Sequence, residues 1–81
     1  MTERATLQSL NPLLLETFEA QVIDVSEQGI SLQLTKHIAT QSEVKIRRGT
    51  AILFGEVRYC VPAGDGFRAG VRIKETVRPP A

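Results

Sequence analysis

The strict alternation of apolar and polar residues near the end of the chain is the feature that most constrains its fold. Between residues 67 and 74 every second residue is apolar: Phe67, Ala69, Val71 and Ile73. Successive side chains of a β-strand point to opposite faces of a sheet, so this period of two predicts a strand with one buried face. Residues 62–66, P-A-G-D-G, are a strong turn signal. They predict that residues 50–61 pair with residues 67–74 as an antiparallel hairpin.

Three other segments show the same alternation: residues 18–22, 30–34 and 44–47. Within residues 50–61 the expected core positions share one parity: Leu53, Val57, Tyr59 and Val61. Gly55 has this parity too and is expected to mark a bulge or a bend. Residues 35–42 are polar and lack a period, so they are expected to form a loop. Short strands, intervening turn signals and hardly any helix predict a small all-β barrel or sandwich.

The beginning of the chain does not fit the strand pattern. Residues 5–16 are rich in leucine and are interrupted by Asn11-Pro12, which excludes one continuous helix through this point. We therefore expect an N-terminal arm or short helical turn over residues 1–16, the β domain over residues 17–76, and a short tail over residues 77–81. The arm is expected to offer apolar surface to the barrel or to a partner through its leucines: Leu7, Leu10, Leu13, Leu14 and Leu15.

Length and composition limit the class of protein. A chain of 81 residues forms one domain with a modest core. It contains no apolar run near 18 residues, so no membrane-spanning helix is expected. The first residues lack a basic stretch followed by a long apolar run, and the one cysteine, Cys60, excludes an internal disulfide. These features predict a cytoplasmic protein.

The net charge of +1 hides an asymmetry between the two halves of the chain. Residues 1–44 hold two Lys or Arg against six Asp or Glu, whereas residues 45–81 hold eight against three. A basic half can attract an anion, but basic residues also occupy the solvated outer faces of strands, and both interpretations stay open. Binding of single-stranded nucleic acid would require exposed aromatic side chains on which the bases can stack. The chain has only three Phe and one Tyr, most at expected core positions, so DNA is not an expected partner and an OB-like nucleic-acid binder is a distant alternative.

The residues that could support catalysis are few. The only histidine, His37, lies in the polar loop, and Cys60 has the parity opposite to the expected core set. One cysteine without clustered histidines gives no metal-ligand spacing, so neither a metal nor an enzymatic activity is expected. A Cys–His nucleophile pair remains as an alternative, because proximity in the fold is not visible in the sequence.

The turn D-V-S-E-Q-G-I, residues 24–30, is the motif with the most chemistry. An ionised Asp24 can accept the paired N–H donors on the edge of a guanine, and Ser26 can donate or accept. Gly29 allows a left-handed backbone, or close approach of the backbone to a flat ring. The same residues are also common in turns, where Asp and Ser bond to their own backbone. Chemistry alone leaves a guanine site and a structural turn as equal interpretations.

The segment A-Q-V-I-D-V-S-E-Q-G-I-S-L, residues 20–32, resembles the [D/N]-x-S-x-x-G signature of the PilZ domain family. Residues 55–73, G-E-V-R-Y-C-V-P-A-G-D-G-F-R-A-G-V-R-I, resemble the closing hairpin of that family, and the similarity covers residues 18–74. The resemblance implies a six-stranded antiparallel β-barrel. It also implies a receptor for cyclic di-GMP, a bacterial second messenger that controls motility, biofilm formation and polysaccharide output. Asp24, Ser26 and Gly29 would line one guanine.

The chain departs from the family in the arm before the first strand. Family members that bind the messenger have an R-x-x-x-R motif there, whereas this arm has a single arginine, Arg4. Two functions are therefore expected as alternatives: a cyclic di-GMP module of motility and biofilm signalling that uses Arg4 with the turn, or a PilZ-like adaptor that binds a protein of motility or secretion machinery without the nucleotide. The basic residues expected to support a nucleotide site are Arg58, Arg68 and Arg72.

Overall fold

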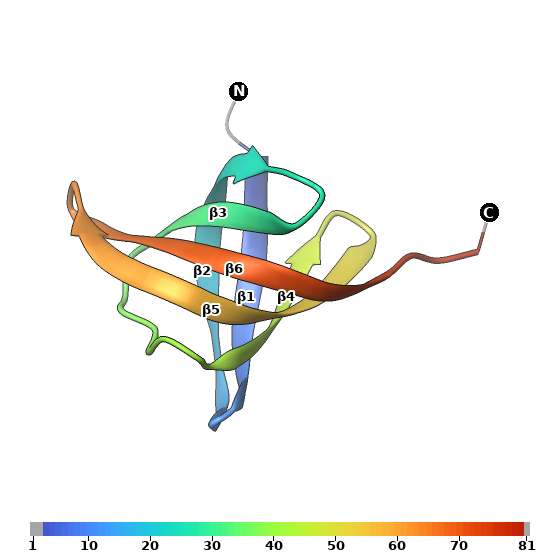
Figure 1. Cartoon of the computed structure of the whole chain (residues 1–81), viewed down its shortest axis with the longest axis horizontal. Coiled ribbons are helices and arrows are strands. Elements are labelled where there is room, and N and C mark those ends of the chain that lie inside the picture. Colours follow the sequence, from blue (N-terminus) through green and yellow to red (C-terminus); the bar gives the residue numbers. More distant parts are fainter. Residues whose placement is uncertain (1–2, 81) are drawn as a thin grey trace.

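The computed structural model describes residues 3–80, which form six β-strands and no helix (Figure 1). The strands are β1 (Glu3–Asn11), β2 (Leu13–Val25), β3 (Gly29–Leu34), β4 (Glu43–Arg48), β5 (Ala51–Ala63) and β6 (Gly66–Val77). Each pairs antiparallel with its neighbours, and together they close a barrel in the order β1-β2-β3-β6-β5-β4. The all-β prediction is confirmed, and the structure selects a six-stranded barrel over a sandwich. The described part of the chain has no helix long and apolar enough to cross a membrane.

The expectation of an N-terminal arm or helical turn is wrong. Residues 3–11 form β1, a wall strand that pairs with β2 on one side and with β4 on the other. Asn11-Pro12 lies at the turn between β1 and β2, a position where proline does not interrupt a ladder of hydrogen bonds. Leu7 has no exposed surface and belongs to the core, so the barrel begins at Glu3 and not at residue 17. At the other end, β6 extends to Val77.

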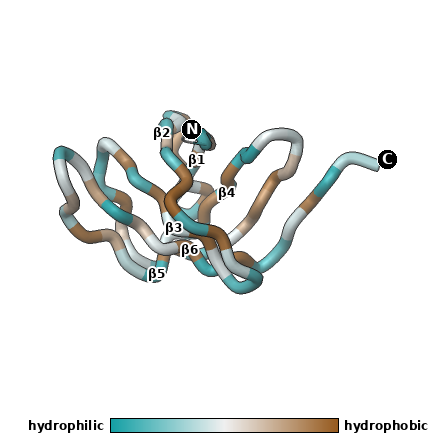
Figure 2. Tube along the Cα trace, turned by 90° about the horizontal axis from the view of Figure 1, so that it is seen from above, coloured by the Kyte–Doolittle hydropathy of each residue, from teal (hydrophilic) through white to brown (hydrophobic). Residues whose placement is uncertain are grey.

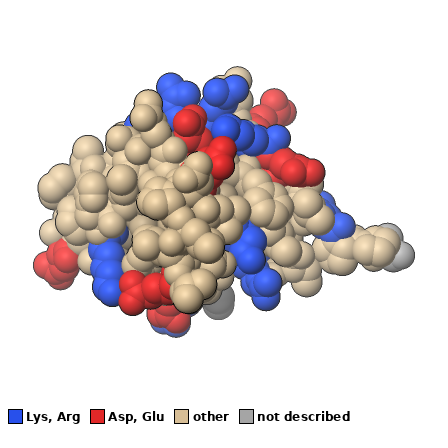
Figure 3. All heavy atoms as spheres, turned by 90° about the horizontal axis from the view of Figure 1, so that it is seen from below, with Lys and Arg blue, Asp and Glu red and all other residues tan. Residues whose placement is uncertain are grey.

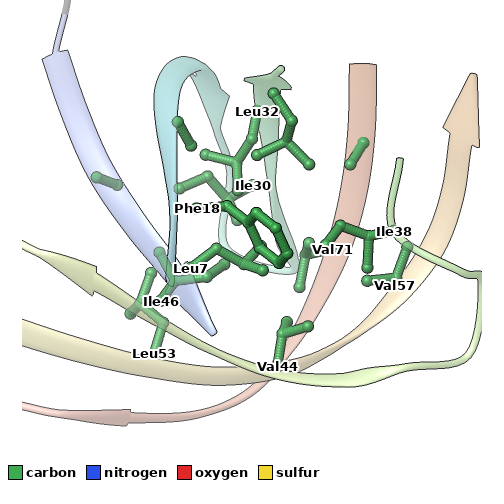
Figure 4. Packing of buried hydrophobic residues seen from close by; sticks show 14 residues of the cluster. Leu7, Phe18, Ile30, Leu32, Ile38, Val44, Ile46, Leu53, Val57 and Val71 are labelled. Carbon is green, nitrogen blue, oxygen red and sulfur yellow. The ribbon is translucent and has the colours of Figure 1, made fainter. Parts of the chain in front are cut away.

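The core fills the barrel with side chains from all six strands (Figure 4). Its largest fully buried side chains are Leu7, Leu32, Leu34, Ile46, Val44 and Val57. Burying one such side chain contributes about 1.5–3 kcal/mol. The loop of residues 35–42 also contributes, because Ile38 packs into the same cluster with only 4% of its surface exposed. Hydropathy alternates along the strands, as Figure 2 shows for the Cα trace, so the wall of the barrel separates the core from solvent.

A bulge in β5 reverses the parity expected for the end of that strand. Val57 pairs with Val71, but Tyr59 pairs with the next residue, Gly70, so Arg58 is an extra residue in β5. After the bulge, Tyr59 and Val61 face outward with 41% and 45% of their surface exposed. Their assignment to the core is wrong for this reason. The side chain of Cys60 is partly buried against the core. The expected irregularity at Gly55 is confirmed, because the register of β5 and β6 also shifts between Phe54 and Gly55.

The charge asymmetry of the sequence follows the strand order, because β1, β2 and β3 of the acidic half lie together in the barrel, as do β4, β5 and β6, which come mostly from the basic half. Ion pairs nevertheless link the two halves of the chain at Arg48–Glu3 and Lys74–Glu43. The hydrogen bond from Arg48 to Glu3 raises the pKa of this guanidinium above its ordinary value. On the face seen in Figure 3, basic and acidic side chains lie in mixed groups. Much of the positive charge therefore belongs to solvated outer faces of strands.

Candidate functional site

The turn between β2 and β3 is held by the hydroxyl of Ser26. Its Oγ accepts hydrogen bonds from the backbone N–H of Gln28 at 3.3 Å and of Gly29 at 3.2 Å. The backbone N–H of Ser26 also donates to the carbonyl of Gly29 at 2.9 Å. A side-chain oxygen that bonds to the backbone two and three residues later closes a tight turn. Ser26 is thus a structural residue of the turn, as one of the two interpretations predicted.

Gly29 has a different role from the expected one. Its backbone is not in the left-handed region, where Gly49 and Gly64 are found. A Cβ atom at Gly29 would lie 2.6 Å from the carbonyl oxygen of Val71 on β6. The backbone N–H of Ile73 donates to the carbonyl of Gln28 at 3.0 Å and fixes the turn against the same strand. Gly29 is therefore required by the close approach of β3 and β6. A left-handed backbone conformation is not the reason for a glycine at this position.

Asp24 is the member of the motif that stays free to contact another molecule. Its Oδ1 accepts a hydrogen bond from the backbone N–H of Val25 at 3.0 Å, and its side chain is otherwise exposed to solvent. A carboxylate has two oxygens and about four lone pairs, so one local bond leaves capacity for two further donors. The turn thus orients the carboxylate of Asp24 and leaves most of its hydrogen-bond acceptor positions available.

The strand register places Asp24 at one end of an outward-facing row that crosses four strands. Asp24 on β2 lies opposite Ser31 on β3, Ser31 lies opposite Gly70 on β6, and Gly70 lies opposite Tyr59 on β5. A Cβ at Gly70 would lie 2.2 Å from the ring of Tyr59, so this ring lies directly against the Gly70 backbone. The row therefore presents a carboxylate, a hydroxyl and an aromatic ring on one side of the barrel.

Two arginines border this row. Arg72 lies opposite Gly29 on β3 and opposite Glu56 on β5, and Arg58 is the bulged residue next to Tyr59. Together with the row they surround an open hollow of about 370 Å³ on the barrel surface. We call it the β2–β3 hollow, and it is lined by Asp24, Ser26, Gln28, Gly29, Ile30, Ser31, Arg58, Tyr59, Gly70, Val71 and Arg72.

The structure brings together most of the site residues expected from the sequence. Those that line the β2–β3 hollow are Asp24, Ser26, Gly29, Arg58 and Arg72. Arg4 lies elsewhere, because antiparallel pairing of β1 holds it opposite Gln21 in the barrel wall, where it lines a separate hollow. Arg68 also lies elsewhere, opposite Gln33 on β3 and Val61 on β5. Neither arginine contributes to the β2–β3 hollow.

Ser31, Tyr59 and Gly70 are among the six lining residues that the sequence did not predict for the site; the others are Gln28, Ile30 and Val71. Tyr59 was assigned to the core, since strict alternation from Leu53 gives it an inward parity. Only the bulge at Arg58 turns the ring outward. Gly70 carries one local signal, because a glycine within a strand often marks close approach of another group. Here that group is the Tyr59 ring.

The histidine and the cysteine have structural contacts in the described chain. The Sγ of Cys60 accepts a hydrogen bond from the backbone N–H of Ile38 at 3.5 Å. The ring of His37 stands edge-on to the ring of Phe67, with 5.4 Å between the ring centroids. Both groups therefore stabilise the loop of residues 35–42 against the barrel.

The β2–β3 hollow combines three kinds of recognition chemistry. An ionised carboxylate accepts two N–H donors in parallel, guanidinium groups pair with phosphate oxygens, and an exposed aromatic ring stacks on a flat heterocycle. A guanine nucleotide presents all three complementary features. Comparisons of the chain with protein-family models, with curated proteins and with solved structures give no match.

Proposed function

We propose that this protein is a PilZ-like, non-enzymatic receptor module that binds cyclic di-GMP at the β2–β3 hollow and acts in cytoplasmic signalling for motility or biofilm formation. The observation that supports the proposal is the row of Asp24, Ser31, Gly70 and Tyr59, bordered by Arg58 and Arg72. The D-x-S-x-x-G turn alone would be explained by its own hydrogen bonds. The convergence of an aromatic ring and two arginines on that turn is not required for the turn to fold.

Each recognition group has a defined role in the proposal. The carboxylate of Asp24 accepts the two adjacent N–H donors on the edge of one guanine, a pairing that adenine cannot offer. The Tyr59 ring stacks on the base, and one such stack is worth about 1–3 kcal/mol. Arg58 and Arg72 pair with the phosphates, where guanidinium groups bind bidentately.

The position of Arg4 limits the expected affinity. An arginine bound to a phosphate contributes about 1.5–3 kcal/mol per hydrogen bond, so the missing R-x-x-x-R pair should weaken binding by tenfold or more for each bond. Arg4 lines a different hollow and does not compensate. Binding in the proposed site is therefore expected to be weak and to depend on Arg58 and Arg72.

A second candidate is a PilZ-like adaptor that binds a protein of motility or secretion machinery without the nucleotide. It is favoured by the full use of Ser26 and Gly29 within the fold and by the location of Arg4 outside the β2–β3 hollow. In that case Asp24 and the arginines would contact the partner protein as exposed polar residues.

Calorimetric titration with cyclic di-GMP separates the two candidates. The wild-type chain should bind, Asp24→Ala should abolish binding, and Asp65→Ala, which removes an exposed acid outside the β2–β3 hollow, should leave it unchanged. Cyclic di-AMP should not bind, since it lacks the paired donors of guanine. Absence of binding by a folded wild-type protein would reject the receptor and leave the adaptor. Equal binding by Asp24→Ala would reject the assignment of the site.

A further inference from the structure

One side of β2 is unpaired over half of its length. β3 pairs with β2 only from Ala20 to Val25, whereas β1 pairs with the other side of β2 as far as Leu13. Residues 13–19 of β2 therefore form a free edge, which we call the leucine edge. No strand within residues 3–80 pairs with it. Every second residue there directs its N–H and C=O away from β1, as in any antiparallel strand. Such an edge is a template for another strand.

Residues 13–15 of the leucine edge have no protecting charge, whereas Glu16 and Glu19 lie farther along the edge and Glu16 pairs with Lys36. Leu13, Leu14 and Leu15 have 64%, 42% and 87% of their surface exposed, on both faces of the strand. Residues 5–15 contain no charged residue. The tip of this hairpin projects beyond the rest of the barrel (Figure 1). Proteins commonly guard free edges with charges or proline within the edge, and residues 13–15 lack both, which favours strand pairing at this end of the hairpin.

We propose that two copies of this chain pair antiparallel through their leucine edges, with Leu15 at the twofold axis. This register places Leu15 against its own copy, Leu13 against Thr17, and Leu14 against Glu16. The leucines at positions 13 and 15 of both copies then form one apolar strip on the same face, because side chains alternate between faces. The two subunits would form a continuous sheet across the axis.

The sequence of the edge favours a second copy as its occupant. A twofold interface uses the same patch on both subunits, so the edge must be complementary to itself. In the Leu15 register no charged residue lies directly opposite a like charge. Leu15 lies opposite a leucine, Leu13 opposite Thr17, and Leu14 opposite the aliphatic part of the Glu16 side chain. Moving the axis to Glu16 would set two carboxylates directly opposite each other, which destabilises an antiparallel pair. The edge is thus compatible with a second copy in the Leu15 register and disfavours the register centred on Glu16.

The dimer is independent of the proposed nucleotide site. Leu15 and Asp24 are nine residues apart on the same strand, which corresponds to about 30 Å. Pairing at the leucine edge therefore leaves the β2–β3 hollow open, and failure of one proposal does not affect the other.

Sedimentation equilibrium of the full chain tests the proposal. The wild type should show a concentration-dependent dimer. Leu15→Lys should weaken it by at least on the order of a hundredfold, because both copies lose a buried leucine. Val61→Lys, a matched change at an exposed apolar residue of β5, should leave the dimer intact. A wild type that stays monomeric at every concentration, or a dimer insensitive to Leu15→Lys, would overturn the proposal and point to a different protein or a membrane surface as the occupant.

Cysteine cross-linking tests the register. In a Cys60→Ser background, which leaves one thiol per chain, Leu15→Cys should form a covalent dimer under mild oxidation. Its two Cα atoms would lie about 4.5–5.5 Å apart, within the range of a disulfide. Thr17→Cys should cross-link poorly, since it faces residue 13 of the other copy. Equal cross-linking of the two variants would overturn the Leu15-centred register.

Discussion

Two hairpins of this barrel extend beyond the strands that flank them, and their free edges have opposite chemistry. The first is the leucine edge of β2, where β3 pairing stops at Ala20. The second is residues 58–63 of β5, where pairing with β4 stops at Glu56. The second edge contains Arg58 and Pro62, whereas the first has no charge or proline between residues 13 and 15. Charge and proline prevent strand addition.

The two edges have similar backbone geometry but suit different kinds of recognition. At the β5 edge the bulge turns Tyr59 and Arg58 toward Asp24, so the surface offers separate polar and aromatic groups to a small molecule. At residues 13–15 of the leucine edge the side chains are apolar, and the backbone offers the only directional contacts there, whereas Glu16, Thr17 and Glu19 follow on the same edge. Substitutions at the core, at the β2–β3 hollow and beside the leucine edge test this contrast.

The largest effect is expected where the first hairpin joins the core. Leu7→Ala should lower the free energy of unfolding by about 2–5 kcal/mol, because Leu7 is fully buried and the change leaves a cavity. Leu15→Ala, in the same hairpin but exposed, should change it by no more than about 0.5 kcal/mol. Urea titration at low protein concentration, where the chain is monomeric, measures both. Similar costs for the two leucines would mean that β1 is an arm and not a wall strand.

The second prediction compares two glycines of the β2–β3 hollow. Gly29→Ala should cost about 1–3 kcal/mol of stability, because the new Cβ meets a backbone carbonyl that cannot move alone. Gly70→Ala should cost less, since the Tyr59 ring can rotate away, but it should weaken nucleotide binding by displacing that ring. Thermal unfolding and calorimetric titration of both variants provide the two measurements. A larger stability loss for Gly70→Ala would contradict this division of roles.

The third prediction separates two arginines of β6. Arg72→Ala should weaken cyclic di-GMP binding about tenfold, because Arg72 lines the β2–β3 hollow and would lose a charge-assisted phosphate contact. Arg68→Ala removes the same charge four residues earlier on β6, outside that hollow, and should leave the affinity unchanged. Equal losses in titration would show that net charge attracts the ligand and that no defined site exists.

The smallest effect is expected at the ion pair beside the leucine edge. The Nζ of Lys36 lies 3.2 Å from Oε1 of Glu16 and 5.7 Å from the centroid of the Phe18 ring. The side chains of Lys36 and Glu16 are both more than half exposed. Lys36→Ala should therefore cost about 1 kcal/mol of stability or less. Urea titration measures this cost, and a loss well above about 1 kcal/mol would contradict the assignment of Lys36–Glu16 as an exposed ion pair.

Much of the fold could be predicted from local pattern. Alternation predicted strands over residues 18–22, 30–34, 44–47, 50–61 and 67–74, and all of these residues except Thr50 lie in strands. Residues 62–66 gave the turn of the β5–β6 hairpin. The pattern failed at β1, because a leucine-rich stretch interrupted by Asn11-Pro12 has no clean period although Leu7 is a core residue. It failed again after Arg58, because a bulge leaves no reliable local signal in the sequence. The bulge exchanges the inward-facing and outward-facing positions for every later residue of β5.

Local sequence was enough to locate five of the six strands, at least in part, and to place a turn with Asp24, Ser26 and Gly29 between β2 and β3. These depend on the backbone preferences and hydrogen bonds of residues close together in the chain. Tertiary structure alone decided that Tyr59 faces outward, that Arg58 and Arg72 approach Asp24 while Arg4 does not, and that one side of residues 13–19 lacks a neighbour. Those outcomes depend on the register between strands, which is set by packing of the whole core.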